Sequence, residues 1–172
     1  PPFAEILAAT PPVRRMGTVP SSEDRRSRSP CLNIELIGIP LDELKPMMQL
    51  IESLGHQPVL VEETPRALTQ LLKKPAQIII ADMSMPALDP ADFCRRLRQS
   101  VTGEDCYALF LASPEQEHRA LEVIDAGADD VLIKPVNDQA LRVHLTTAVR
   151  MLVLREQIHR ERQGMMRSTD EF

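Results

Sequence analysis

The sequence predicts an α/β fold in which parallel strands alternate with helices. From Cys31 onward, short apolar stretches alternate with longer segments of helical periodicity. The stretch 77–82 is almost unbroken in its apolar character, as expected of a strand covered on both faces. Gly55 and Gly127 end helical segments, and Asp89 followed by a proline begins one. Strands joined through helices form right-handed parallel units, so one layered sheet is expected.

The individual elements follow from local pattern and from turn residues. Strands are predicted at 32–39, 58–61, 77–82, 107–112 and 130–133. Helices are predicted at 42–54, 65–72, 90–97 and 115–126, and from Asn137 or Asp138 to about 163. Five strands connected in this way indicate a flavodoxin-like sheet with the strand order 2-1-3-4-5.

Three regions differ in composition. Residues 1–30 hold six prolines and five arginines and are predicted to be a flexible Pro/Ser/Arg-rich linker or tail. A phosphorylation or anion-binding role for the Arg/Ser run at 21–29 is the alternative. Residues 31–150 are predicted to form the folded domain. Residues 151–172 continue the last helix as a linker toward a further domain.

Bulk composition excludes several classes of protein. The 172 residues suffice for one domain with appendages, and the 43% apolar content is ample for a core. A net charge of −5 gives no support for a nucleic-acid surface, and no apolar run approaches the length of a membrane span. The three cysteines have neither paired nor metal-like spacing, which favours reduced thiols and a cytoplasmic location.

Two charged residues are predicted to meet at one edge of the sheet. Asp82 ends an apolar strand and is followed by Met85-Pro86, while Lys134-Pro135 ends the strand that begins after Gly127-Ala128-Asp129. The carboxyl ends of parallel strands share one edge, where sites form in open α/β sheets. These motifs, with Lys134 standing 52 positions after Asp82, resemble the CheY-like receiver domain of bacterial response regulators. The resemblance covers residues 32 to about 150.

The resemblance implies a role for each matching position. Asp82 corresponds to the phosphoacceptor and Lys134 to the lysine that stabilises the phosphoryl charge. The acidic pair that would help Asp82 to hold Mg²⁺ falls at Gly38 and Ile39, whose side chains offer no ligand, and the nearest acids are Glu35 and Asp42. The switch hydroxyl position is Ala112, with Ser113 adjacent, and the switch aromatic position is Val131. The chain therefore resembles a degenerate receiver.

The missing acids leave two functions open. With one carboxylate at Asp82, Mg²⁺ binding is expected to be weak, no other cofactor is expected, and Asp82 is expected to pair directly with Lys134. The first function is a regulatory receiver-like module of a two-component signalling protein with little or no phosphorylation. The alternative is a working receiver that is phosphorylated on Asp82 by a histidine kinase in a phosphorelay. No catalytic residues are predicted, and no Gly-rich phosphate loop follows the first strand to support a nucleotide-binding enzyme.

The last predicted helix carries two apolar stripes. One stripe, Leu141, Leu145, Ala148 and Leu152, suits packing on the sheet. The other includes Met151, Leu154 and Ile158, which are candidates for a homodimer or for contact with an output domain. An amphipathic helix that frays into a tail is the alternative. The closing residues 168–172 resemble the entry of diguanylate cyclase (GGDEF) domains, which would place cyclic di-GMP synthesis in a C-terminal output domain.

Overall fold

The computed structural model describes residues 30–63, 65–86, 89–100 and 105–169. In this part of the chain, parallel strands form one sheet with the order β2-β1-β3-β4-β5. The strands are β1 (Asn33–Ile37), β2 (Gln57–Val61), β3 (Ile78–Asp82), β4 (Tyr107–Ala112) and β5 (Asp130–Ile133). The predicted flavodoxin-like fold and strand order are confirmed.

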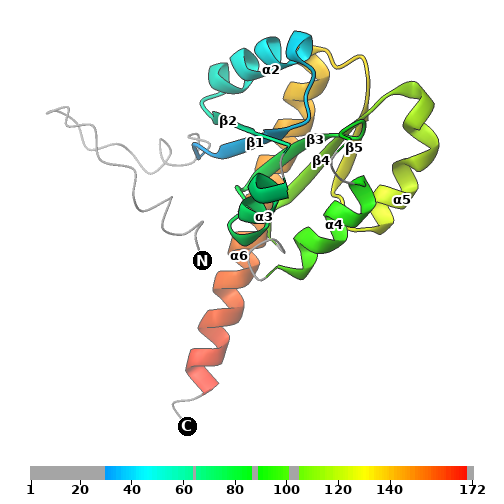
Figure 1. Ribbon diagram of the computed structural model, residues 1–172. Coiled ribbons are helices and arrows are strands. Elements are labelled where there is room, and N and C mark those ends of the chain that lie inside the picture. The colour runs from blue at the N-terminus through cyan, green and yellow to red at the C-terminus, as the bar shows by residue number, and fades with distance from the viewer. Residues whose placement is uncertain (1–29, 64, 87–88, 101–104, 170–172) are drawn as a thin grey trace, which may run out of the picture. The chain divides into compact units, whose positions relative to one another are not determined.

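Helices cover both faces of the sheet (Figure 1). They are α2 (Leu41–Ser53), α3 (Pro65–Lys73), α4 (Pro90–Gln99), the 3₁₀ helix η1 (Pro114–Arg119), α5 (Ala120–Asp125) and α6 (Asp138–Thr169). In the figure α2 and the first half of α6 lie on one face, and α3, α4 and α5 lie on the other. This layering explains why β3 and β4 are buried along their whole length and are apolar up to Asp82 at the end of β3.

The core lies between the central strands and these helices. Every residue of β3 and β4 is buried. On the face covered by α3, α4 and α5, Phe93 and Phe110 pack edge to face with ring centroids 6.3 Å apart. On α6, the predicted core stripe is buried: Leu141, Leu145, Ala148 and Leu152. The apolar packing thus fixes the sheet edge at which β3 and β5 end.

Two predicted helices differ from the structure. The helix predicted at 115–126 begins as a 3₁₀ helix, because the Gln116 amide N–H bonds the Ser113 carbonyl at 2.9 Å in an i→i+3 pattern. The last helix runs to Thr169 instead of ending near residue 163. Gly164 lies inside it, since one glycine weakens a helix without ending it.

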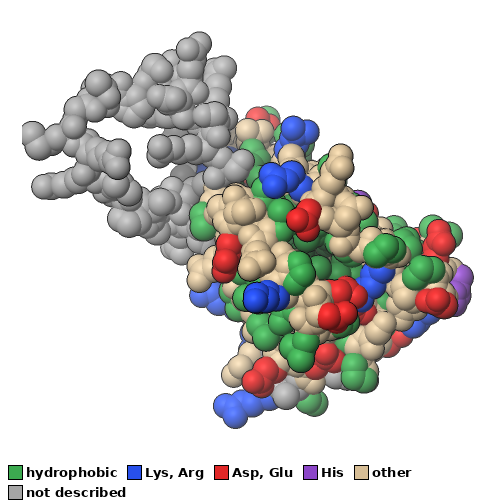
Figure 2. All heavy atoms as spheres, turned by 90° about the horizontal axis from the view of Figure 1, so that it is seen from above, with side chains coloured by type: hydrophobic (Ala, Val, Ile, Leu, Met, Phe, Trp, Pro, Cys, Tyr) green, Lys and Arg blue, Asp and Glu red, His purple; other side chains and the backbone are tan. Residues whose placement is uncertain are grey.

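The described chain divides into two compact units. Cys31–Leu152 forms one unit, and α6 from Val153 belongs to the other. The predicted linker at 1–30 lies outside the described residues, apart from Pro30. No helix in the described ranges combines the length and hydropathy needed to cross a membrane. Acidic, basic and hydrophobic side chains are interspersed on the face that Figure 2 presents.

Candidate functional site

Asp82 and Lys134 meet at the carboxyl edge of the sheet, as predicted. Asp82 is the last residue of β3, and Lys134 follows the last residue of β5. The Lys134 amide N–H bonds the Ala112 carbonyl at 2.8 Å, which continues the β4–β5 pairing and brings the lysine alongside β3. Asp82 is completely buried, and its Oδ2 forms an ion pair with Lys134 Nζ. The direct ion pair that the missing acids suggested is therefore present.

A second carboxylate shares this lysine. Glu43, in the first turn of α2, places Oε1 3.1 Å from Lys134 Nζ. Burial lowers the pKa of Lys134, but hydrogen bonds to Asp82 and Glu43 outweigh burial, and the pKa is raised above its ordinary value. Glu43 Oε2 is buried and has no hydrogen-bond partner among the described residues. The Lys134 ammonium thus contacts the carboxylates of both Asp82 and Glu43.

The other Asp82 oxygen is also engaged. Oδ1 accepts a hydrogen bond from the Ser84 amide N–H at 2.7 Å. Such a bond to the backbone two residues ahead closes a local turn after the strand. Both oxygens of the buried carboxylate therefore have partners within the protein.

Neighbouring groups approach closely at Gly38, one of the two positions where the acidic pair was expected. Gly38 has a φ of +65°, and a Cβ there would lie 2.9 Å from the Met85 Cβ and 3.1 Å from Glu63 Oε1. A side chain at this position would be strained and would clash. Ile39 is buried. Glu63, from the segment after β2, brings a carboxylate against Gly38 that the sequence did not predict there.

The positions of the switch residues carry no hydroxyl or aromatic ring. Ala112 ends β4 and is completely buried, and Val131 is half-buried in β5. The adjacent Ser113 starts η1: its amide N–H donates to Gln116 Oε1 at 3.0 Å. The Ser113 hydroxyl bonds the Glu115 carboxylate, which lowers the pKa of Glu115. Ser113 is thus bonded within η1.

These side chains do not fit a Mg²⁺ site of the receiver kind. Mg²⁺ requires near-octahedral oxygen ligands and is usually held by one or two carboxylates with waters. Here Gly38 and Ile39 supply no side-chain oxygen, and an ammonium already contacts Asp82 Oδ2. In the parts of the chain that the structure describes, no three His, Cys, Asp or Glu side chains gather as a group that could hold a metal ion.

The family model of the response regulator receiver domain matches residues 42–146. The chain belongs to the response regulator receiver domain family. Domains of this family are regulatory, and they commonly work with histidine kinases and output domains. The resemblance based on Asp82, Lys134 and their flanking motifs is confirmed at the level of the family.

Individual relatives agree with this assignment. The receiver domain is 30% identical over 96 residues to response regulator MprA from Mycobacterium sp. (strain KMS) and from Mycobacterium leprae (strain TN). Each match covers 56% of this chain and 41% of the relative, so the chain spans well under half of these proteins.

Solved structures show the same fold. A putative response regulator from Chloroflexus aurantiacus aligns with a TM-score of 0.63 and 20% identity, over 70% of this chain and 98% of that one. The receiver domain of the Pseudomonas aeruginosa sensor histidine kinase PA1611, with magnesium in its active-site cleft, aligns with a TM-score of 0.61 and 21% identity. That alignment covers 69% of this chain and 98% of that one.

The candidate output residues lie on α6. Met151, Leu154 and Ile158 are 42%, 54% and 48% exposed. They are exposed in the single chain. Their spacing of three and four residues places them along one side of the helix.

Sequence reasoning missed three polar side chains around the site: Glu43, Glu63 and Gln116. Glu43 lies 91 positions from Lys134, so no local pattern reveals the contact. A usable signal was its place in the first turn of a helix, because the helices that follow parallel strands begin at the same sheet edge.

Proposed function

We propose that this receiver domain is a regulatory module that acts with little or no phosphorylation of Asp82. The supporting observation is the Asp82–Lys134–Glu43 cluster, in which a lysine of the protein neutralises the buried carboxylate. The degenerate state of the site, and with it the weak Mg²⁺ affinity at Asp82, belong to this proposal.

The physical argument concerns charge and access. Transfer of a phosphoryl group depends on positioning and on neutralising the charge of the phosphoryl oxygens. Asp82 is completely buried, one oxygen pairs with Lys134, and the other accepts from the Ser84 amide. A phosphoryl donor would have to displace these partners at a site without the side chains that normally help to hold the metal.

The test is an intact-mass spectrum after incubation with acetyl phosphate and Mg²⁺, with Asp82→Asn as the control. We expect no adduct of one phosphoryl group in the folded protein. An adduct that disappears in Asp82→Asn would establish the alternative function, a working phosphoacceptor in a phosphorelay with a histidine kinase as partner. Circular dichroism of both proteins shows whether they are folded.

We further propose that the domain forms a homodimer through the exposed stripe of α6. Two copies would bury Met151, Leu154 and Ile158 against each other along one seam. Sedimentation velocity tests this with Ile158→Asp against Gln157→Asp, which adds the same charge to the neighbouring exposed position. We expect Ile158→Asp to raise the dimer dissociation constant by about a hundredfold or more, because each dimer loses two buried isoleucines. Equal behaviour of the two variants would exclude the seam.

We also propose that residues 151–172 lead to an output domain of the diguanylate cyclase class, with residues 1–30 as a linker or tail. The support is the similarity of residues 168–172 to the entry of such domains; residues 170–172 lie outside the described chain. The test is to assay the natural gene product for conversion of GTP to cyclic di-GMP. If the folded full-length protein forms no cyclic di-GMP, the output domain is not an active diguanylate cyclase and the proposal is wrong.

A further inference from the structure

The segment formed by η1 and α5 buries few apolar side chains in the core. No residue of η1 is buried, and Val123 is the one buried residue of α5. Leu121, at 75% exposed, and Ile124, at 38%, face outward. By contrast, the preceding helix α4 buries five residues in the core. Segments with few buried apolar contacts open at low free-energy cost, so polar contacts decide where this segment lies.

The first polar contact is made by Gln116. Its Nε2 lies 3.3 Å from the Ser84 hydroxyl, and its Oε1 accepts from the Ser113 amide N–H at 3.0 Å. Ser84 in turn donates its own amide N–H to Asp82 Oδ1. Gln116 therefore joins the start of η1 to the turn that directly follows Asp82.

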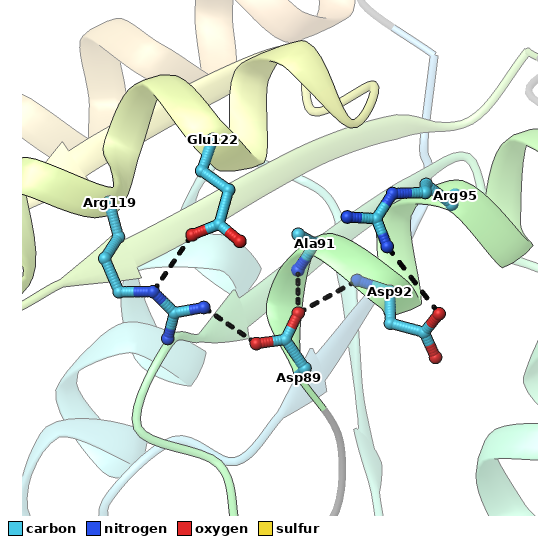
Figure 3. A network of polar contacts seen from close by, with 6 residues as sticks. All are labelled: Asp89, Ala91, Asp92, Arg95, Arg119 and Glu122. Atoms are coloured by element: carbon cyan, nitrogen blue, oxygen red, sulfur yellow. Dashed lines mark hydrogen bonds and ion pairs between the residues drawn. The ribbon is translucent and has the colours of Figure 1, made fainter.

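The second polar contact is made by Arg119, at the end of η1 (Figure 3). Its guanidinium forms an ion pair with Asp89 at 2.7 Å and another with Glu122 at 3.1 Å. Asp89 has a double role, because its Oδ1 also caps α4 through the amide groups of Ala91 and Asp92 at 3.1 Å. The hydrogen bond from Arg119 is the main cause of a lowered pKa for Asp89, which is consistent with a formed ion pair.

We propose that Gln116 and Arg119 are a polar latch that holds η1 and α5 against Ser84 and Asp89. The two contacts are made near the two ends of the connection between β3 and α4, and the one to Ser84 lies next to Asp82. In this molecule the position of η1 and α5 is set by side chains of η1 itself. Opening the latch moves the exposed Leu121 and Ile124 and changes the surface offered to a partner.

The latch has a chemical signature that distinguishes it from apolar packing. Asp89 and Arg119 side chains are 48% and 32% exposed, so salt screens their attraction. A basic group of a partner can compete with Arg119 for Asp89, and an acidic group can compete with Asp89 for Arg119. Releasing the latch should leave the sheet intact, since neither contact involves a core residue.

The experiment is hydrogen–deuterium exchange with mass spectrometry on the whole chain, following peptides that cover residues 113–126. In Gln116→Ala/Arg119→Ala, we expect these amides to exchange about three- to tenfold faster. The variant loses the hydrogen bonds of Gln116 to Ser84 and Ser113 and the ion pairs of Arg119 to Asp89 and Glu122, each of which contributes little because it is at least partly exposed to water. Peptides from β3 and β4 should be unchanged. Added salt should accelerate exchange of 113–126 in the parent protein and not in the double variant.

Two further variants make the result specific. Arg96→Ala removes an exposed ion pair to Asp92 that lies within α4 alone, and it should leave exchange of 113–126 unchanged. Asp89→Asn removes the charge while keeping a good helix cap, and it should give part of the acceleration. Unchanged exchange in the double variant, or equal acceleration in β3 and β4, would overturn the latch. Either result would leave the proposal on phosphorylation untouched, because the two do not depend on each other.

Discussion

Two cation–carboxylate pairs lie at opposite ends of β5, and they are built differently. Before the strand, Arg98 binds Asp129 at 2.7 Å, the Gly127 carbonyl at 2.8 Å and the Cys106 carbonyl at 2.6 Å. After the strand, Lys134 contacts the side chains of Asp82 and Glu43.

The difference lies in what the cation holds. Asp129 also accepts the Ala108 amide N–H at 2.8 Å, so the arginine end joins α4 to the backbone of two neighbouring segments. The lysine end joins side chains, and one Glu43 oxygen there is buried without a hydrogen-bond partner among the described residues. The Arg98 pair therefore holds backbone segments together. The Lys134 cluster compensates the charges of two carboxylates, and substituting Lys134 removes no side-chain hydrogen bond to the backbone.

The largest expected effect is at the arginine end. Arg98→Ala should lower the free energy of unfolding by about 2–4 kcal/mol. It removes the cation that pairs with the mostly buried Asp129 carboxylate and the hydrogen bonds from Arg98 to the Gly127 and Cys106 carbonyls. Urea unfolding followed by circular dichroism measures this. Arg96→Ala, which removes an exposed ion pair on the same helix, should cost less than about 0.5 kcal/mol. Similar losses in the two variants would contradict the structural role of Arg98.

A smaller effect is expected at the lysine end. Lys134→Met should lower the free energy of unfolding by about 1–3 kcal/mol, because it leaves the completely buried Asp82 carboxylate unpaired. Asp82→Asn in the same background should restore part of that loss. A double-mutant cycle on the two residues should therefore give a coupling of about 1–2 kcal/mol. Additive losses would show that the ion pair contributes nothing to stability.

The pH dependence of the lysine end has a definite sign. Because the pKa of Lys134 is raised in the folded protein, its stabilising effect is fully present below the ordinary value of about 10.4. The effect is lost as the pH rises through the higher folded value. The stability gap between the parent protein and Lys134→Met should therefore narrow in urea titrations above that pH. A constant gap would mean that Lys134 does not lose its proton in the accessible range.

Local sequence signals predict the strands and the Asp82–Lys134 pair, but they do not predict the other polar side chains around the site. β4 and β5 match their predicted residues, and the others lie within or next to them, since apolar runs bounded by glycine and proline are local signals. Asp82 and Lys134 were predictable because their strands end at one edge. Glu43, Glu63 and Gln116 were not, because the approach of each depends on the path of a connecting segment. The sequence predicts Gly127 only as a helix stop. In the structure its missing Cβ also makes room for Arg98, because a Cβ there would lie 2.7 Å from the Arg98 Cγ.

The smallest expected effect concerns thiols near the arginine end. Cys94 and Cys106 are buried, and burial raises the pKa of Cys94 to about 12, whereas Cys31 is exposed. In the native protein a thiol reagent should therefore modify Cys31 rapidly and the other two slowly, since the thiolate is the reactive form. Cys31→Ser should remove the fast phase.

Arg98→Ala then links thiol reactivity to the comparison of the two ends. This variant removes the hydrogen bond from Arg98 to the Cys106 carbonyl. The core around Cys94 and Cys106 should then open more often, so that both thiols are modified faster. Lys134→Met should accelerate their modification less. Equal acceleration by the two variants would mean that both ends of β5 open together with the whole domain. A rate that rises in Arg98→Ala alone would show that the arginine end by itself keeps this part of the core closed.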